Sequence, residues 1–187
     1  MYYVNQNLVD LHRIVYQNNR KEYLRLDLNE NPGGLPQEFI DEVLNDITPK
    51  FVSQYPETLE FENCLAKFLN VNNDNLCLVN GSSEGIRHII EAFSAPGGKI
   101  VGVVPSYAMY QVYAQMYGRE FIQVKYNDDL TISADTIIDA LSEDVDLLVL
   151  LNPNNPVGNA YSNEEFEKIL EAAKKYEITI LVDEAYM

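Results

Sequence analysis

The sequence predicts an α/β fold, a three-layer α/β/α arrangement with a mainly parallel sheet, preceded by an N-terminal helical arm. Two observations lead to this prediction. From residue 57 onward, segments with helical spacing of apolar residues alternate with short, continuous apolar runs. Such runs are typical of strands that are buried on both faces, as in a parallel sheet covered by helices.

The first 50 residues are predicted to form an arm outside the sheet, and residues 51–187 are predicted to form the sheet domain. Two helical stripes flank a polar stretch at 26–34 in the arm. The first stripe consists of Val4, Leu8, Leu11 and Val15, and the second of Ile40, Val43, Leu44 and Ile47.

In the sheet domain the predicted elements alternate regularly. Strands are expected at 76–79, 100–104, 121–124, 147–151 and 178–182. Helices are expected at 61–69, 86–93, 110–117, 137–141 and 166–173, the last opened by a capping box of Ser162 and Glu165.

Composition excludes several classes of partner. Thirteen Lys and Arg against 29 Asp and Glu give the 187-residue chain a net charge of −16, which argues against binding to nucleic acid or to an anionic membrane surface.

No apolar run approaches the length of a membrane span, and the first residues lack the order of a signal peptide. Cys64 and Cys77 have no metal-binding spacing, so we expect buried thiols and a cytoplasmic protein.

The residues that follow each predicted strand are the candidates for a site, because ligands of open α/β sheets lie outside the carboxyl ends of the strands. Ser82 and Ser83 follow the first strand and begin a helix. They could hold a phosphate group at the helix N-terminus, or one of them could simply be the N-cap residue.

Tyr107 and Asn155 follow two further strands. Tyr107 could stack on a planar cofactor, although core packing is an alternative that we prefer for Tyr110. Asn155 lies in NPNNPVG at 152–158, where two prolines exclude a regular helix or ladder and hold amide side chains at the sheet edge. A turn would explain one Asn-Pro pair, and two such pairs directly after a buried strand favour a functional loop over this alternative.

Asp183 ends the last predicted strand. A carboxylate there needs a partner, and no Lys or Arg lies nearby in the sequence. A bound cation such as a pyridinium would serve, and an N-cap role is the alternative. His12 and His88 indicate no catalytic triad, and His88 is expected at the surface.

Six pieces in fixed order resemble the fold-type I pyridoxal-phosphate aminotransferases, above all the histidinol-phosphate aminotransferase branch. They are LNENP at 28–32, QYP at 54–56, GSSEGI at 81–86, PSYAMY at 105–110, NPNNPVG at 152–158 and DEAY at 183–186. The resemblance implies that residues 1–50 are an arm and part of the small domain. Residues 51–187 would be the N-terminal, incomplete portion of the cofactor-binding large domain.

The resemblance also implies roles in binding pyridoxal 5′-phosphate. Asp183 would pair with the pyridine nitrogen, which keeps the ring an electron sink. Asn155 and Tyr186 would hydrogen-bond the 3′ oxygen of the ring. Tyr107 would stack on the ring, and the turn of Ser82 and Ser83 would hold the phosphate.

Three residues before the sheet are implied to complete the site. Tyr55 would reach the phosphate of the neighbouring subunit's cofactor, which implies a homodimer with a shared active site. Asn29 and Asn31 would line the substrate mouth.

The sequence departs from the family in two ways. Val157 stands where the family usually has threonine, which leaves the role of the asparagine intact. The lysine that forms the Schiff base follows this region in the family and is absent from this chain; Lys174 and Lys175 lie at the wrong place, on the preceding helix. Without the family's later cations, we expect weak, non-covalent cofactor binding at best.

The expected function is therefore that of the N-terminal part of an aminotransferase. It would move an amino group between an amino acid, with histidinol phosphate as one candidate, and a 2-oxo acid, and the chain as given is expected to be inactive. The alternatives are a pyridoxal-phosphate-dependent phospho-amino-acid decarboxylase and a non-catalytic fragment.

Overall fold

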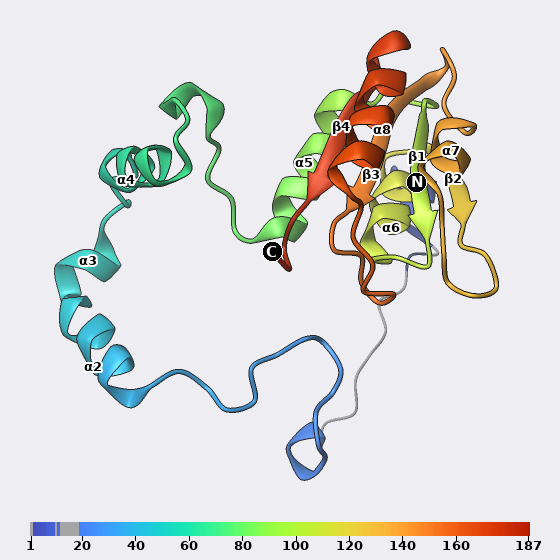
Figure 1. Cartoon of the computed structure of the whole chain (residues 1–187). Coiled ribbons are helices and arrows are strands. Elements are labelled where there is room, and N and C mark those ends of the chain that lie inside the picture. Colours follow the sequence, from blue (N-terminus) through green and yellow to red (C-terminus); the bar gives the residue numbers. More distant parts are fainter. Residues whose placement is uncertain (1, 10, 12–18) are drawn as a thin grey trace. The chain divides into compact units, whose positions relative to one another are not determined.

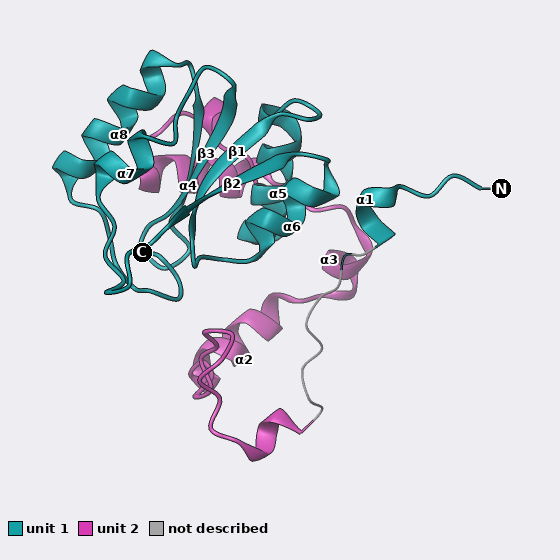
Figure 2. Cartoon of the chain, turned by 90° about the vertical axis from the view of Figure 1, so that its right-hand side faces the viewer, with its two compact units in different colours: residues 1–12, 79–187 teal, residues 13–78 magenta. Residues whose placement is uncertain are grey.

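The computed structural model describes residues 2–9, 11 and 19–187 and divides the chain into two compact units. Unit 1 consists of residues 1–12 and 79–187, and unit 2 of residues 13–78 (Figure 2). The predicted domain boundary at residue 50 stays a prediction. No helix in the described residues is both long and apolar enough to cross a membrane.

Unit 1 contains a four-stranded parallel sheet in the order β2-β1-β3-β4 (Figure 1). Its strands are β1 (Lys99–Val104), β2 (Glu120–Lys125), β3 (Val145–Leu151) and β4 (Thr179–Asp183). They match four of the five strands predicted from continuous apolar runs, and β3 is almost fully buried along its length. This confirms the predicted α/β class and the parallel sheet.

Helices cover both faces of this sheet. They are α5 (Ser82–Phe93) and α6 (Met109–Met116) on one face, and α7 (Ala134–Ile138) and α8 (Asn163–Lys175) on the other (Figure 2). Each face has its own core: Ile90 and Tyr110 pack on Leu147 and Leu181, whereas Ile169 packs with Leu148 on the opposite side. The short helix α1 (Gln6–Val9) packs against α6.

Strong local signals explain where the helices begin. The Ser162 hydroxyl accepts a hydrogen bond from the Glu165 backbone N–H at 3.2 Å, and the Glu165 carboxylate accepts one from the Ser162 N–H at 2.9 Å. This is the predicted capping box. At the start of α7, the Ser133 hydroxyl accepts a hydrogen bond from the Thr136 N–H.

Unit 2 consists of short helices joined by extended segments. They are η1 (Arg20–Glu22), α2 (Gln37–Asp46), α3 (Pro49–Ser53), α4 (Leu59–Leu69) and η2 (Asn73–Asn75). The predicted helices at 40–47 and 61–69 are present, and α3 was not predicted. Of the predicted helix with stripe residues from Val4 to Val15, the structure has Gln6–Val9, and residues 12–18, which include His12 and Val15, lie outside the described residues.

The prediction of a strand at 76–79 was wrong. This segment has no ladder partner in the described residues and lies where the two units divide. An apolar run indicates a strand only if a neighbouring edge accepts its backbone hydrogen bonds.

The prediction of buried thiols was also wrong. Cys64 on α4 and Cys77 are both exposed. Cys64 does lie on a helical apolar stripe, but in unit 2 that stripe has little to pack against, so the periodicity does not lead to burial.

Candidate cofactor site at the carboxyl edge of the sheet

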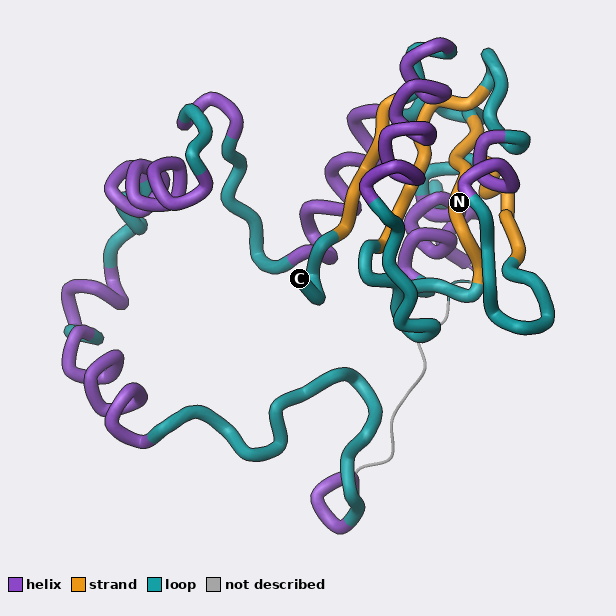
Figure 3. Tube along the Cα trace, in the orientation of Figure 1, coloured by secondary structure: helices purple, strands orange, loops and turns teal. Residues whose placement is uncertain are grey.

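The loops after the parallel strands meet at one edge of the sheet in unit 1 (Figure 3). Six of the predicted site residues belong to this unit: Ser82, Ser83, Tyr107, Asn155, Asp183 and Tyr186. Tyr107 follows β1, Asn155 follows β3, and Asp183 ends β4 in register with Leu151. The sheet therefore positions residues that lie far apart in the sequence.

Asp183 is a buried carboxylate, with 8% of its surface exposed. Its Oδ2 accepts a hydrogen bond from the Tyr110 hydroxyl at 2.7 Å, and its Oδ1 accepts one from the Ala185 N–H at 3.1 Å. Among the described residues it forms no ion pair. A buried carboxylate with neutral donors alone is a favourable place for a bound cation. Residues 184–187 form no helix in the structure, and the alternative role of Asp183 as a helix N-cap stays a prediction.

Tyr110 is the residue that sequence reasoning missed. The prediction that it packs in the core is confirmed, but its hydroxyl also holds Asp183. Burial and the neighbouring carboxylate raise the pKa of Tyr110, so the hydroxyl stays protonated and donates. The available signal was a tyrosine, rather than phenylalanine, on a buried helical stripe near a candidate ring-stacking residue.

Tyr107 connects this region to the start of α5. Its hydroxyl lies 2.9 Å from the Ser83 hydroxyl, and its ring packs edge-on against Tyr110 at a centroid distance of 5.6 Å. Tyr107 lies just before α6, and Tyr110 lies in its first turn. Through these two tyrosines, the end of the β1–α6 loop contacts Ser83 and the start of α6 contacts Asp183.

The start of α5 is open to an anion. The N-cap residue is Gly81 rather than Ser82 or Ser83, so the predicted serine cap is wrong. Gly81 has φ +80° and ψ 165°, a conformation that favours glycine, and nothing lies within 4 Å of where its Cβ would be. The hydroxyls of Ser82 and Ser83 are consequently not used as caps. The Glu84 N–H donates to the Gly81 carbonyl at 3.2 Å, so among the described residues the N–H groups of Ser82 and Ser83 are the ones at this helix start without an intrahelical partner.

The Glu84 side chain fixes the chain entering this turn. Its Oε2 accepts from the Asn80 backbone N–H at 2.6 Å and from the Asn80 Nδ2 at 2.9 Å. These bonds lower the pKa of Glu84, which keeps it ionised. His88 is exposed, as predicted, and its Nε2 lies 3.9 Å from the Glu84 carboxylate.

Asn155 and Tyr186 lie at the same edge. Asn155 is half-buried in the β3–α8 loop, which is tied to β4 by a 2.9 Å hydrogen bond from the Asn152 N–H to the Asp183 carbonyl. Tyr186 follows β4 and is 46% exposed. Lys174 and Lys175 lie in the last turn of α8, on the opposite face of the sheet from α6.

The remaining predicted residues belong to unit 2. Tyr55 is 97% exposed. Asn31 stabilises its own turn, since its Oδ1 accepts from the Gly33 N–H and its Nδ2 donates to the Gly34 carbonyl. Asn29, with φ +51°, lies in the same segment. The structure therefore brings six predicted residues to one edge and leaves Asn29, Asn31 and Tyr55 in the other unit.

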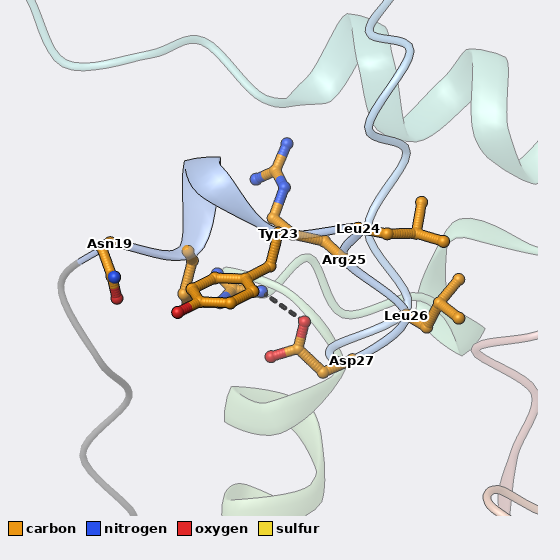
Figure 4. Close-up of a pocket in the computed structure, with 7 residues that line it drawn as sticks. Asn19, Tyr23, Leu24, Arg25, Leu26 and Asp27 are labelled. Atoms are coloured by element: carbon orange, nitrogen blue, oxygen red, sulfur yellow. Dashed lines mark hydrogen bonds and ion pairs between the residues drawn. The ribbon is translucent and has the colours of Figure 1, made fainter.

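Unit 2 has a pocket of its own, of about 380 Å³, lined by residues between Asn19 and Asp27 (Figure 4). Tyr23, Leu26 and Asp27 line it, and an ion pair joins Arg20 to Asp27 at 2.8 Å. Sequence reasoning did not identify this pocket, because neither its shape nor this ion pair follows from a motif.

Comparison with known proteins identifies the class. Residues 21–187 match the family described as aminotransferase class I and II, so the chain belongs to that family. It is 35% identical over 167 residues to the histidinol-phosphate aminotransferase of Chlorobaculum tepidum, covering 88% of this chain and 47% of that protein. It is 34% identical over 187 residues to the enzyme of the same name from Chlorobium phaeobacteroides, covering 98% and 51%.

Solved structures agree. The histidinol-phosphate aminotransferase of Clostridium acetobutylicum superposes with a TM-score of 0.70 at 31% identity, over 83% of this chain and 45% of that one. Cystalysin from Treponema denticola, whose structure contains pyridoxal 5′-phosphate, shares the fold with a TM-score of 0.67 at 18% identity, over 79% and 39%. The chain spans about half the length of the curated relatives it matches. The family membership supports pyridoxal 5′-phosphate as the cofactor.

Proposed function

We propose that the carboxyl edge of this sheet is the pyridoxal 5′-phosphate site of an aminotransferase, which transfers an amino group between an amino acid and a 2-oxo acid. The observation that carries the proposal is the buried Asp183 carboxylate, held by Tyr110 and without a cation among the described residues. The names of the relatives support histidinol phosphate as the amino donor or product.

The residues present fit the cofactor by their chemistry. Asp183 would face the ring nitrogen, where a negative charge favours the protonated pyridine. Tyr107 would stack on the ring, and Asn155 and Tyr186 would donate hydrogen bonds to the 3′ oxygen. The turn of Gly81, Ser82 and Ser83 would hold the phosphate through N–H and hydroxyl groups. When bound, the cofactor supplies an electron sink that stabilises negative charge on the substrate carbon.

The chain's own residues would act as a rigid cradle. Two hydrogen bonds orient the Asp183 carboxylate, and Tyr110 stays a protonated donor to it because burial and this carboxylate raise the pKa of Tyr110. The Ser83–Tyr107 contact would couple the phosphate end to the stacked ring. Binding and orientation are thus the contributions of this part of the enzyme.

Three further assignments belong to this proposal. Asn29 and Asn31 would contact the substrate, and Tyr55 would reach the cofactor phosphate of a partner subunit in a homodimer. The 97% exposure of Tyr55 is what a residue contributed to another subunit requires. Cross-linking of the chain in solution tests the dimer directly.

The test of the site is cofactor binding by the whole 187-residue chain. Equilibrium dialysis should detect pyridoxal 5′-phosphate, and pyridoxine 5′-phosphate, which lacks the aldehyde, should compete about equally because the holding groups named here are non-covalent. Asp183→Asn should raise Kd at least tenfold, about 1.4 kcal/mol, by removing the charge that faces the pyridinium.

A matched control lies at the other end of the same sheet. Asp146 in β3 accepts a hydrogen bond from the Ala95 N–H at 2.7 Å, so Asp146→Asn makes the same chemical change at the amino edge. It should leave cofactor Kd unchanged. No binding to the wild-type chain, or equal losses in the two variants, would overturn the proposed site.

A further inference from the structure

The β3–α8 loop holds two adjacent asparagines, and the proposed function uses only Asn155. Asn154 is the more buried of the two, with 4% of its surface exposed. It is one of three buried polar or charged residues among the described residues, and the other two are Ser94 and Asp183. A buried amide in a loop needs partners for its oxygen and both of its N–H groups.

The side chain of Asn154 has all of these partners. Its Oδ1 accepts from the Ser106 hydroxyl at 2.7 Å. Its Nδ2 donates to the Pro105 carbonyl at 3.0 Å and to the Tyr126 hydroxyl at 2.9 Å. Pro105 and Ser106 follow β1, Tyr126 follows β2, and Asn154 itself follows β3. One amide therefore joins the ends of three neighbouring strands.

The backbone of Asn154 closes its own loop. Its N–H donates to the Asn159 carbonyl at 2.8 Å, and its carbonyl accepts from the Gly158 N–H at 2.6 Å. The Tyr126 hydroxyl donates in turn to the Asn159 Oδ1. Asn154 thus fixes the β3–α8 loop internally and attaches it to the β1–α6 loop.

We propose that Asn154 is a positioning residue that sets the placement of Tyr107 relative to Asn155. Tyr107 directly follows Ser106, and Asn155 directly follows Asn154, so each lies one residue from the hydrogen bond that joins their loops. The proposal rests on the proposed function, in which Tyr107 stacks on the cofactor ring and Asn155 binds its 3′ oxygen. Asn154 itself touches neither group.

Asn154→Asp tests this role with almost no change in shape. The substitution replaces the Nδ2 donor by an oxygen that faces the Pro105 carbonyl, which turns an attraction into a repulsion. Asn127→Asp is the matched control, because the exposed Asn127 Nδ2 donates to the Thr131 hydroxyl at 3.1 Å, outside these loops. If Asn154→Asp does not fold, Tyr126→Phe removes the two bonds of the Tyr126 hydroxyl, to Asn154 and to Asn159, and leaves those of Asn154 to Pro105 and Ser106.

The first readout needs no cofactor. In Asn154→Asp, amide hydrogen exchange should accelerate at least tenfold at two sites. One is Gly158 in the β3–α8 loop, and the other is Tyr110, which follows the β1–α6 loop and whose N–H is bonded to the Tyr107 carbonyl. Amides of β3 report global unfolding and serve as the reference. Tyr126→Phe should produce the same pattern at about threefold, and Asn127→Asp should produce none. Acceleration confined to Gly158, or equal to that of β3, overturns the proposal.

The second readout is the circular dichroism that fixed orientation induces in bound pyridoxine 5′-phosphate. Asn154→Asp should lower this signal per bound molecule at least twofold and raise Kd at least fivefold, whereas a purely structural role would lower thermal stability alone. If the wild-type chain binds no cofactor, the proposed function fails, while the exchange experiment still decides whether Asn154 couples the two loops.

Discussion

Residues 79–187 and residues 19–78 carry the same kind of amphipathic helices, but only the first set has a surface for those helices to cover. In unit 1 the sheet gives α5, α6, α7 and α8 a shared partner, and each face has a buried core. In the described residues 19–78, Ala66 is the one buried side chain. The apolar face of a helix is thus buried here where a sheet is available for it to cover, and periodicity alone does not bury it.

The largest expected effect on stability is that of truncating a core side chain. Leu148→Ala, in β3 with a fully buried side chain, should lower the free energy of unfolding by about 3 kcal/mol. Phe68→Ala on α4, where the ring is 84% exposed, should change it by less than about 0.5 kcal/mol. Urea unfolding followed by circular dichroism measures both. Similar losses in the two variants would show that unit 2 has a core comparable to that of unit 1.

The second prediction concerns close packing on the sheet. A Cβ at Gly102 in β1 would lie 2.5 Å from the ring tip of Phe121 in β2, so Gly102→Ala should cost about 1.5 kcal/mol. Adding Phe121→Leu should restore part of that loss. Gly33→Ala in unit 2, where the nearest atom is the Asn31 Oδ1 at 3.4 Å, should cost less than about 0.5 kcal/mol. A costly Gly33→Ala would contradict the contrast between units.

Helix caps should show a smaller difference. Ser162→Ala removes the capping box of α8, whose inner face is buried, and should cost about 1 kcal/mol. Thr48→Ala removes the bond from the Phe51 N–H to the Thr48 hydroxyl, but α3 has no buried residue. The second variant should leave thermal unfolding of the sheet unchanged, and an equal fall in Tm would contradict this.

The smallest expected effect is on acid stability. The pKa of Glu84 in the folded chain is lowered by hydrogen bonds from Asn80, so the unfolded chain takes up the proton first. The contribution of Glu84 is therefore fully present above pH 4.5, its ordinary pKa, and is lost as the pH falls through the folded value. Wild type and Glu84→Gln should converge in stability at low pH. An NMR titration that places the pKa at or above 4.5 would overturn the prediction.

The sequence could predict those parts of the fold where a local pattern, such as an apolar run, coincides with strand pairing in the folded chain. The four strands of the sheet and the capping box of α8 read directly from apolar runs and from Ser162 and Glu165. The segment 76–79 has the same local signal but no paired edge, and α3 has little apolar periodicity. Strand pairing is a non-local property, so a run of apolar residues does not determine it.

For the candidate site, the sequence could predict which loops matter but not how they are connected. Asp183 ends one strand and Tyr107 follows another, and both were found by position. The bond from Tyr110 to Asp183 spans 73 residues, and the bonds of Asn154 to Pro105 and Ser106 span nearly 50. Contacts of this kind require the strand order, which the sequence pattern does not specify.

The register of β4 has a consequence for how this architecture can be altered. Leu181 belongs to the core under α5 and α6, Ile180 packs on the opposite core, and Asp183 shares the face of Leu181. Because strand side chains alternate, deleting a single residue within β4 would turn Asp183 toward α7 and α8 and bring an apolar side chain opposite Tyr110. An insertion in the loops after β3 or β4 does not change which face of the sheet the strand side chains point to. Engineering that changes chain length here is therefore tolerable outside the strands, and within them only in steps of two residues.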